Sequence, residues 1–209
     1  MTRVAVLDYG MGNLRSVEKA LEHVGAAAEL TRDHARIRAA DGLVLPGVGA
    51  FPKAMEDVRR LGFDALMRER LVEGAPVLGI CLGLQLLFES SEEHGGAEGL
   101  GLLEGPVEPL DAPGLKVPQI GWNPVSWRAE SPLIDELPDP CAFYHVHSFA
   151  PRPARDDVLG VADYGVEYVS AVERPPIYGV QFHPEKSGPD GLRLLGNFVR
   201  VCASAQVAA

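Results

Sequence analysis

Cysteine is scarce in this sequence, and long apolar runs are missing from it. The three cysteines, Cys81, Cys141 and Cys202, are odd in number and widely spaced among 209 residues. That pattern does not fit a disulfide framework and is typical of a reducing compartment, so we expect a cytoplasmic location. No apolar run reaches the roughly 18 residues of a membrane helix, and the first residues lack the apolar region and cleavage site of a secretory signal. We therefore expect neither membrane insertion nor secretion.

Positive charge is also in short supply. The net charge of −10 at pH 7 argues against a broad phosphate-binding surface, so nucleic acid is not an expected partner. Hydrophobic residues at 46% and charged residues at 23% are ordinary for a soluble globular protein. A chain of this length fits one large domain better than two small ones, and we predict a single domain over residues 1–209.

The first 90 residues alternate short apolar runs with helical patterns. Asn13 is a suitable cap for the first helix, which Gly25 would stop. Continuous apolar strands that alternate with helices predict an α/β fold, in which helices cover both faces of a mostly parallel central sheet. The expected strands are 4–7, 43–45 and 76–80, and the expected helices are 13–24, 52–61, 63–73 and 82–89.

The middle of the sequence has a different pattern. Glycine and proline are frequent from 95 to 140, where we expect hairpins, loops and an antiparallel extension of the sheet, with one short turn near 133–137. Strand-like runs then return, and a helix capped by Asp190 closes the chain through Cys202. The expected late strands are 143–149, 158–162, 168–172 and 177–182.

A candidate nucleophile stands in the segment Gly79-Ile80-Cys81-Leu82-Gly83, at a predicted junction of strand and helix. A G-x-nucleophile-x-G turn strains the central residue, and its glycines avoid collisions with the strand and helix beside it. The turn exposes the sulfur at the carboxyl edge of the sheet, and the helix amino terminus favours the thiolate. A lone cysteine here would be read as buried and structural; the two glycines favour a nucleophile.

A candidate base follows another apolar strand, in Gln181-Phe182-His183-Pro184-Glu185. Residues two apart on an extended chain point the same way, and Pro184 restricts His183 to an extended conformation. A cysteine nucleophile needs an imidazole as base and acid, and a carboxylate that orients the imidazole. Without the cysteine, the same motif would be read as a solvated turn.

A second histidine pair, His145 and His147, also lies two apart on a predicted strand. With no CxxC motif and no acidic residue close in sequence, the pair makes a weak zinc site, so no metal is expected. We predict that one of the two lines the active site and that the other packs in the core.

A candidate oxyanion site lies in Pro46-Gly47-Val48-Gly49, which follows a core strand. Its backbone amides could bind an oxyanion beside the cysteine, although the motif alone also fits a plain turn.

Six segments together resemble the triad glutamine amidotransferases, and among them the glutaminase subunits of imidazole glycerol phosphate synthase in histidine biosynthesis. The motifs PGVGAF and GWN carry the narrower resemblance, since relatives that serve other synthases usually have PGGPG-like strands. The segments keep the family's order from one end of the chain to the other, and they are 8–14, 45–51, 79–89, 121–123, 144–148 and 179–187. The resemblance implies a flavodoxin-like fold and no cofactor.

The resemblance also implies roles for single residues. Cys81 would form a glutamyl thioester, His183 would be the acid and base, and Glu185 would orient it. The implied glutamine-binding residues are Gln85 at the substrate's polar end, His147 and Ser148 along the pocket, and Glu93 as a counter-charge for the substrate ammonium. The implied oxyanion hole comprises the Leu82 amide and the strand of Gly47, Val48 and Gly49.

Family members are thought to flip a peptide in that oxyanion strand when the partner site is occupied. A β-branched Val48 is stiffer than the glycine of relatives, which suits a site that stays inactive until it is needed. Two departures from the family pattern lie elsewhere. His145 stands where the family usually has an aromatic residue, and Phe149 stands where it usually has tyrosine.

The implied partner is a (β/α)₈-barrel cyclase that docks over the glutaminase mouth and receives the ammonia. Its products would be imidazole glycerol phosphate and an aminoimidazole carboxamide ribonucleotide. The alternatives are a glutaminase of another synthase, a stand-alone γ-glutamyl hydrolase or peptidase, and a regulatory protein with a vestigial site. The matching interface residues are Asn13, Gln119, Trp122, Tyr144 and Lys186, although core packing is an equally good reading of the two aromatic ones.

Overall fold

The computed structural model describes residues 1–11, 14–153 and 155–205. Asn13, expected as a helix cap and an interface residue, lies outside these ranges. The six α-helices of the described residues are α1 (Leu14–His23), α2 (His34–Ala39), α3 (Phe51–Arg60), α4 (Phe63–Val72), α5 (Leu82–Leu86) and α6 (Gly188–Ala205). Short 3₁₀ turns cover Glu93–Gly95, Pro132–Ile134, Arg155–Asp157 and Pro184–Lys186. No helix in the described part of the chain combines the length and apolarity needed to cross a membrane.

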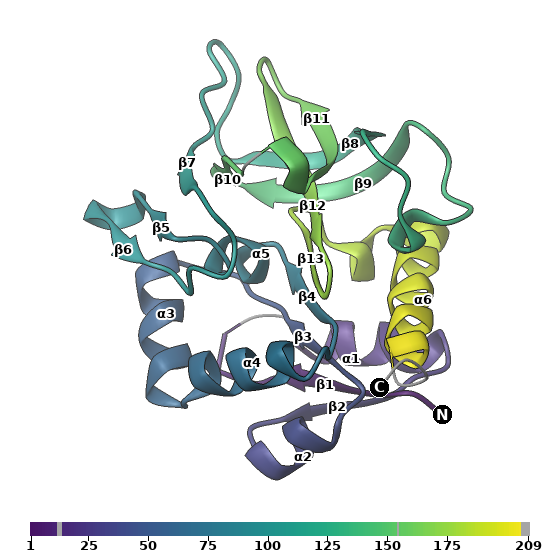
Figure 1. The fold of residues 1–209 in the computed structure, drawn as a ribbon. Helices are drawn as coiled ribbons and strands as arrows, with labels where there is room; N and C mark the ends of the chain where they lie inside the picture. The colour runs from purple at the N-terminus through teal and green to yellow at the C-terminus, as the bar shows by residue number, and fades with distance from the viewer. Residues whose placement is uncertain (12–13, 154, 206–209) are drawn as a thin grey trace.

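A parallel sheet forms the lower half of the molecule in Figure 1. Its strand order is β2-β1-β3-β4-β13, and every neighbouring pair is parallel. The strands are short, and all except β2 are almost entirely buried, as expected for strands that helices cover on both faces. Their bounds are β1 (Arg3–Leu7), β2 (Ala27–Thr31), β3 (Gly42–Leu45), β4 (Val77–Ile80) and β13 (Ile177–Val180).

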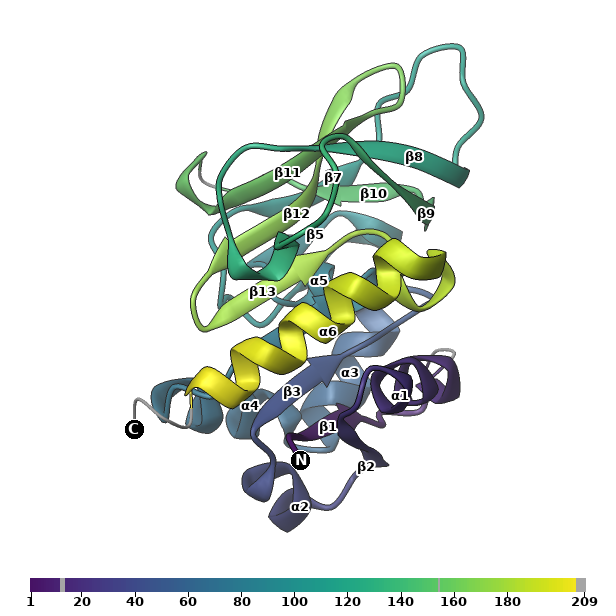
Figure 2. The same ribbon diagram turned by 90° about the vertical axis from the view of Figure 1, so that its right-hand side faces the viewer.

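The helices divide between the two faces of this sheet. Val4 and Val6 of β1 pack in one hydrophobic cluster with side chains of α1 and α6, while Ala5 and Leu7 pack in the other with α2, α3, α4 and α5. The division follows from the strand geometry, because successive side chains point to opposite faces. Figure 2 shows α6 running across one face, with α3 and α4 behind the sheet.

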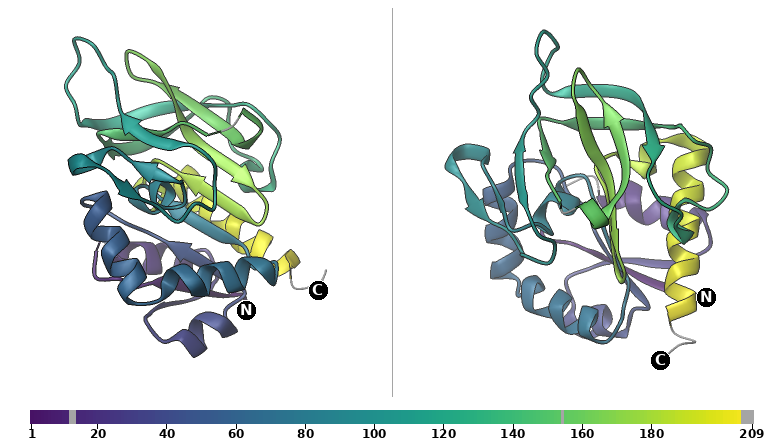
Figure 3. Two further views of the ribbon diagram at one scale, coloured as in Figure 1. Left: turned by 60° about the vertical axis from the view of Figure 1, so that its left-hand side comes forward. Right: turned by 45° about the horizontal axis from the view of Figure 1, so that its top comes forward.

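An antiparallel extension continues the same sheet through β12 (Glu167–Arg174), β11 (Val158–Asp163), β8 (Gln119–Trp127) and β9 (Cys141–His147). A second sheet has the order β10-β7-β5-β6, with β5 (Ser90–Ser91), β6 (Ala97–Glu98), β7 (Pro106–Pro109) and β10 (Phe149–Pro151). The chain passes from β9 to β10 at Ser148, and so changes sheets there. Both parts lie above the parallel sheet in Figure 3.

The predicted fold class is confirmed, with three differences in detail. The sequence pattern missed β2, α2 and the second sheet, because these elements are short or only partly buried. The prediction that Asp190 caps the last helix is wrong: α6 begins at Gly188, so Asp190 lies in its first turn. The helix expected over 82–89 ends at Leu86, and the strand expected over 143–149 breaks at Ser148.

Candidate active site

Cys81 stands at a strained turn between β4 and α5. Its backbone has φ 54° and ψ −113°, a conformation that non-glycine residues rarely adopt, and its N–H is held by the Val180 carbonyl oxygen at 2.8 Å. Strain of this kind persists only where the surrounding structure enforces it. The turn is therefore anchored on β13, the strand that precedes the candidate base.

The two flanking glycines are required by close backbone approach. A Cβ on Gly79 would lie 2.7 Å from the Leu84 Cα, and a Cβ on Gly83 would lie 1.7 Å from the Leu45 carbonyl oxygen. Real Cβ atoms do not come this close to other heavy atoms. The G-x-C-x-G spacing thus has the steric origin expected from the sequence.

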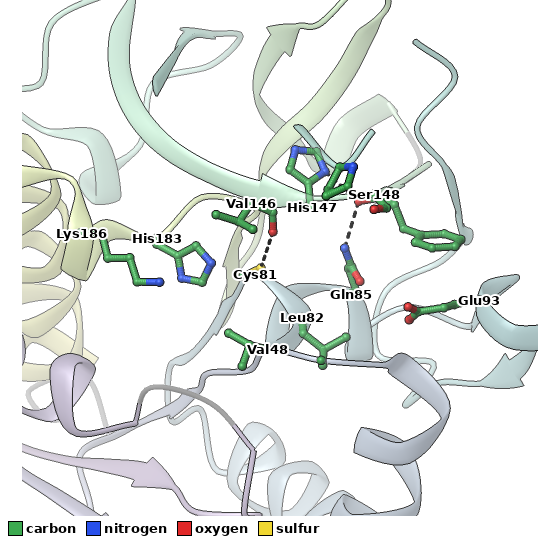
Figure 4. Close-up of a pocket in the computed structure, with 13 residues that line it drawn as sticks. Val48, Cys81, Leu82, Gln85, Glu93, Val146, His147, Ser148, His183 and Lys186 are labelled. Carbon is green, nitrogen blue, oxygen red and sulfur yellow. Dashed lines mark hydrogen bonds between the residues drawn. The ribbon is translucent and has the colours of Figure 1, made fainter. Parts of the chain in front are cut away.

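His183 and Glu185 form a buried pair beside the sulfur. The His183 Nδ1 lies 2.9 Å from the Glu185 Oε1, and the two side chains are only 4% and 2% exposed. Because a carboxylate oxygen accepts, Nδ1 carries the proton and Nε2 is left for the sulfur. Burial lowers the pKa of His183, but its interactions with Cys81 and Glu185 outweigh burial and raise that pKa to about 9. Figure 4 shows the ring directed toward Cys81.

The sulfur has two further contacts that the sequence analysis missed. The Cys81 thiol donates to the Val146 carbonyl oxygen at 3.7 Å, and the Gln181 Nε2 donates to the sulfur at 3.8 Å. Val146 lies on β9, and Gln181 directly follows β13. Only the tertiary structure brings these two segments against the turn.

A cavity of about 260 Å³ opens over Cys81 (Figure 4). It brings together most of the residues that the resemblance assigns to glutamine binding and the oxyanion. Gly47 is not among the lining residues, and a Cβ there would lie 2.2 Å from the Tyr9 Oη. Leu82 begins α5, so its N–H has no carbonyl one turn earlier to bond. The lining residues are Val48, Gly49, Cys81, Leu82, Gln85, Glu93, Pro118, Val146, His147, Ser148, Phe149, His183 and Lys186.

Two polar side chains of the cavity are already engaged with the protein. The Gln85 Nε2 donates to the Phe149 carbonyl oxygen and to the Gln181 Oε1, both at 3.0 Å. The Glu93 Oε2 accepts from the Phe51 N–H at 2.7 Å, at the start of α3, where the cap residue Ala50 makes no side-chain bond. Glu93 therefore has a structural role as a helix cap, and it also brings negative charge to the cavity.

His145 and His147 differ in what they leave free. Both ring nitrogens of His145 are used, at 3.0 Å from the Phe143 carbonyl oxygen and 2.9 Å from the Ser170 Oγ. The His147 Nδ1 bonds the Phe149 carbonyl oxygen at 2.9 Å, while its Nε2 is buried and without a hydrogen-bond partner among the described residues. His147 lines the cavity and His145 packs behind it, as the sequence predicted for one member of each kind.

Burial of the two histidines should make the folded chain less stable in acid. Burial lowers the pKa of His145 to about 3 and that of His147 to about 4, so both are neutral in the folded chain. An unfolded chain binds a proton at each below about pH 6.5, so stability falls as the pH drops through that value. Replacing His145 by phenylalanine should remove about 2 kcal/mol of the loss between pH 7 and pH 5. Urea unfolding at pH 7 and at pH 5 measures the free energy of unfolding of both proteins. The same pH dependence in His145→Phe as in the unaltered chain would contradict this prediction.

The expected interface residues do not share one environment. Trp122 is 59% exposed, and its ring meets the Tyr144 ring edge-on with centroids 6.3 Å apart. Exposure rules out core packing for Trp122. Gln119 does not lie on the surface, as an interface residue was expected to. It is only 3% exposed, because odd and even positions of β8 point to opposite faces and Gln119 points inward. The same alternation places Ile120, which is 58% exposed and which the sequence analysis missed, with Trp122 on the outer face. Lys186 lies at the cavity.

Comparison with known proteins gives consistent results. The family model described as "Glutamine amidotransferase class-I" matches residues 5–202. Two curated proteins similar to this chain are both described as imidazole glycerol phosphate synthase subunit HisH. The one from Moorella thermoacetica is 48% identical over 199 residues, covering 95% of this chain and 94% of the relative. The one from Pseudomonas aeruginosa, HisH 1, is 51% identical over 209 residues, covering 95% and 97%.

A solved structure gives the same fold at low sequence identity. A putative GMP synthase protein of Thermoplasma acidophilum superposes with a TM-score of 0.77, covers 100% of this chain and 97% of its own, and is 22% identical. At that identity the likeness concerns the fold alone.

Proposed function

The chain belongs to the class-I glutamine amidotransferases, and within them to the HisH family, and on that premise we propose how it works as the glutaminase of an imidazole glycerol phosphate synthase. Its reaction is the hydrolysis of glutamine to glutamate and ammonia for histidine biosynthesis. The observation that carries the proposal is the buried His183–Glu185 pair, which faces a strained cysteine at the floor of a cavity. The same features disfavour a vestigial site.

In the proposed mechanism His183 Nε2 takes the thiol proton of Cys81, and the sulfur attacks the amide carbon of glutamine. The tetrahedral intermediate carries its negative charge on the former carbonyl oxygen. It collapses when His183 returns the proton to the nitrogen, so that ammonia leaves and a glutamyl thioester remains. Water, deprotonated by His183, then attacks the thioester and releases glutamate. Glu185 holds the imidazole in the tautomer that both halves require.

The intermediate's oxyanion would be stabilised by backbone amides. The Leu82 N–H is one donor, because it begins α5 and has no helical acceptor. The second would come from Gly47, Val48 and Gly49, which follow β3 beside the turn. Gly49, with φ +104°, has the conformational freedom that a peptide rotation there demands.

Substrate contacts follow from the polarity of the cavity wall. Both donor hydrogens of the Gln85 amide are used by the protein, so its Oε1 is the atom left to accept from a substrate. Glu93 supplies negative charge for the substrate ammonium, although one of its oxygens also caps α3. His147 offers the free acceptor Nε2, and Ser148 lies where the chain changes sheets at the cavity.

The ammonia would pass to a cyclase subunit, which we propose is a (β/α)₈ barrel docked over the cavity. Free ammonia is mostly protonated near neutral pH, so direct transfer avoids its loss to water. The proposed contacts are Lys186, which lines the cavity, Tyr144, whose carbonyl oxygen accepts from the His183 N–H, and Trp122, whose ring meets that of Tyr144. Asn13 is a further candidate outside the described residues. The three cysteines are unpaired, and we propose a cytoplasmic location.

Glutamate release by the purified chain, alone and with the cyclase and its nucleotide substrate, tests the whole proposal. We expect little release by the chain alone and a large rise when both are added. Strong release without the partner would favour a stand-alone γ-glutamyl hydrolase. A rise with the cyclase of a different synthase would assign the chain to that enzyme.

We expect Val48 to keep the glutaminase activity of the isolated chain low. Glycine can adopt a rotated backbone without the roughly 1–3 kcal/mol that such a conformation costs a residue with a side chain, so Val48→Gly should raise partner-independent glutamate release about tenfold. Val48→Ala removes the branch but keeps a side chain, so its partner-independent glutamate release should lie between those of the unaltered chain and Val48→Gly. Equal partner dependence in all three proteins would contradict a gating role for Val48.

Trp122 should contribute strongly to partner affinity. Large exposed aromatic residues at an interface centre often account for about 2 kcal/mol, so Trp122→Ala should weaken binding of the cyclase roughly 30-fold. Titration calorimetry measures the affinity. Val72→Ala is the matched control, because Val72 is 88% exposed at the end of α4, on the opposite side of the molecule from β8 (Figure 1). Equal affinities for the two variants would place the interface elsewhere.

A further inference from the structure

Gln181 is a fully buried side chain that the mechanism above does not use. It is 0% exposed and lies directly after β13, two residues before His183. Its Nε2 is 3.8 Å from the Cys81 sulfur, and its Oε1 is 3.0 Å from the Gln85 Nε2. It is therefore in contact with both the candidate nucleophile and a candidate substrate-binding residue.

The orientation of the Gln181 amide is dictated by a backbone carbonyl. The Phe149 carbonyl oxygen can only accept a hydrogen bond, so the atom of Gln85 that lies 3.0 Å from it must be Nε2. The second N–H of that nitrogen points at Gln181, so the Gln181 atom that accepts it must be Oε1. The NH₂ end of Gln181 then faces the sulfur. Reversing either amide would set two acceptors or two donors against each other, at the cost of a buried unsatisfied group.

The two polar contacts of the sulfur have opposite effects on its proton. The Val146 carbonyl oxygen accepts from the S–H and so stabilises the neutral thiol. The Gln181 N–H donates to the sulfur and is therefore stronger when the sulfur is negatively charged. Loss of the thiol proton turns the first contact from favourable to repulsive, and the Gln181 N–H, together with the protonated His183 ring, offsets that repulsion.

We propose that Gln181 stabilises the thiolate of Cys81, and that the Phe149 carbonyl sets it in the required orientation through Gln85. The inference rests on the proposed role of Cys81 as nucleophile. In the step concerned the thiol proton passes to His183 Nε2, while Gln181 forms and breaks no covalent bond. Substrate binding and activation of the nucleophile are then linked, because Gln85 both faces the cavity and fixes Gln181.

Alkylation of Cys81 by iodoacetamide as a function of pH tests this role, since only the thiolate reacts. Gln181→Met keeps the length of the side chain and removes the donor. We expect its alkylation midpoint to rise by about one pH unit, and the rate at pH values below both midpoints to fall about tenfold. Ser170→Ala is the control: it removes a buried hydroxyl from His145 and leaves the contacts of the sulfur intact, so its midpoint should match the unaltered chain. Mass spectrometry identifies the modified cysteine.

An unchanged midpoint in a folded Gln181→Met protein would overturn the proposal and leave Gln181 a packing residue. If that variant does not fold, Gln181→Glu replaces it: an oxygen still accepts from Gln85, but a second oxygen faces the sulfur, so alkylation should slow at least as much. An unaltered rate there would equally overturn the proposal.

The assay uses no glutamine and no cyclase, so it separates this inference from the proposed function. If Cys81 were not a glutaminase nucleophile, the midpoint would still shift while glutamate release stayed absent in every protein. In the active protein, Gln181→Met should lower kcat more than it raises KM, whereas Gln85→Met should change both.

Discussion

Cys81→Ala is expected to lower glutamate release by about four orders of magnitude or more in the complex with the cyclase, and to remove what little release the isolated chain shows. Without the sulfur no thioester forms, and loss of a triad nucleophile typically costs nearly all of the catalysis that the triad provides. The Gln85 Oε1 and the backbone N–H donors of the site would still bind glutamine. Glutamate release measured enzymatically over a range of enzyme concentrations provides the check.

Two controls make that result specific. Cys141→Ala removes another buried thiol, on β9, and should keep activity, because Cys141 lies in the hydrophobic core and outside the cavity lining. The Cys81→Ala protein bound to the cyclase should still support turnover of the nucleotide when ammonium salts replace glutamine. Retention of glutamine-dependent turnover by Cys81→Ala would rule out the thioester mechanism.

Gly83→Ala is expected to destabilise the chain by about 3 kcal/mol or more and to lower activity strongly. Its new Cβ would meet the Leu45 carbonyl oxygen at 1.7 Å and the Leu45 carbonyl carbon at 2.6 Å. Both belong to the backbone of β3, so neither can turn aside as a flexible side chain would. Relief requires α5 to move away from β3, which separates Leu82 from the oxyanion strand.

Gly196→Ala is the matched control for this substitution. It lies inside α6, where the added Cβ would be 3.8 Å from the Val24 Cβ, an ordinary contact. Because alanine favours a helix more than glycine does, this change should be neutral or stabilise by up to about 1 kcal/mol. Urea unfolding of the two variants gives the comparison. A Gly83→Ala protein as stable as Gly196→Ala would show that the turn tolerates a side chain.

The buried His183–Glu185 pair should tolerate few substitutions. The two side chains are almost fully enclosed, and the Glu185 Oε2 has no hydrogen-bond partner among the described residues. Removing either partner would leave a buried group without its hydrogen bond, which in such pairs costs about 3–5 kcal/mol. Substitutions at His183 or Glu185 should therefore be checked for stability before their kinetics are interpreted.

The sequence by itself predicted most of the parallel half of the fold, except β2 and α2, and the candidate residues of the site. Continuous apolar runs at 4–7, 43–45 and 76–80 identify buried strands because such strands have no polar face. The glycines around Cys81 and the proline after His183 are local constraints on the backbone, so they are visible without the tertiary structure. Residues two apart on a strand could likewise be expected to point the same way.

The tertiary structure alone decided which distant segments meet. The contacts of Cys81 with Val146 and Gln181 join residues 65 and 100 positions apart, and no periodicity encodes such pairings. The burial of Gln119 and the exposure of Ile120 depend on which face of β8 the rest of the fold covers. The short second sheet forms only because β7 finds partners on both sides. Local backbone preferences can be read from neighbouring residues, whereas long-range packing depends on the whole chain being folded.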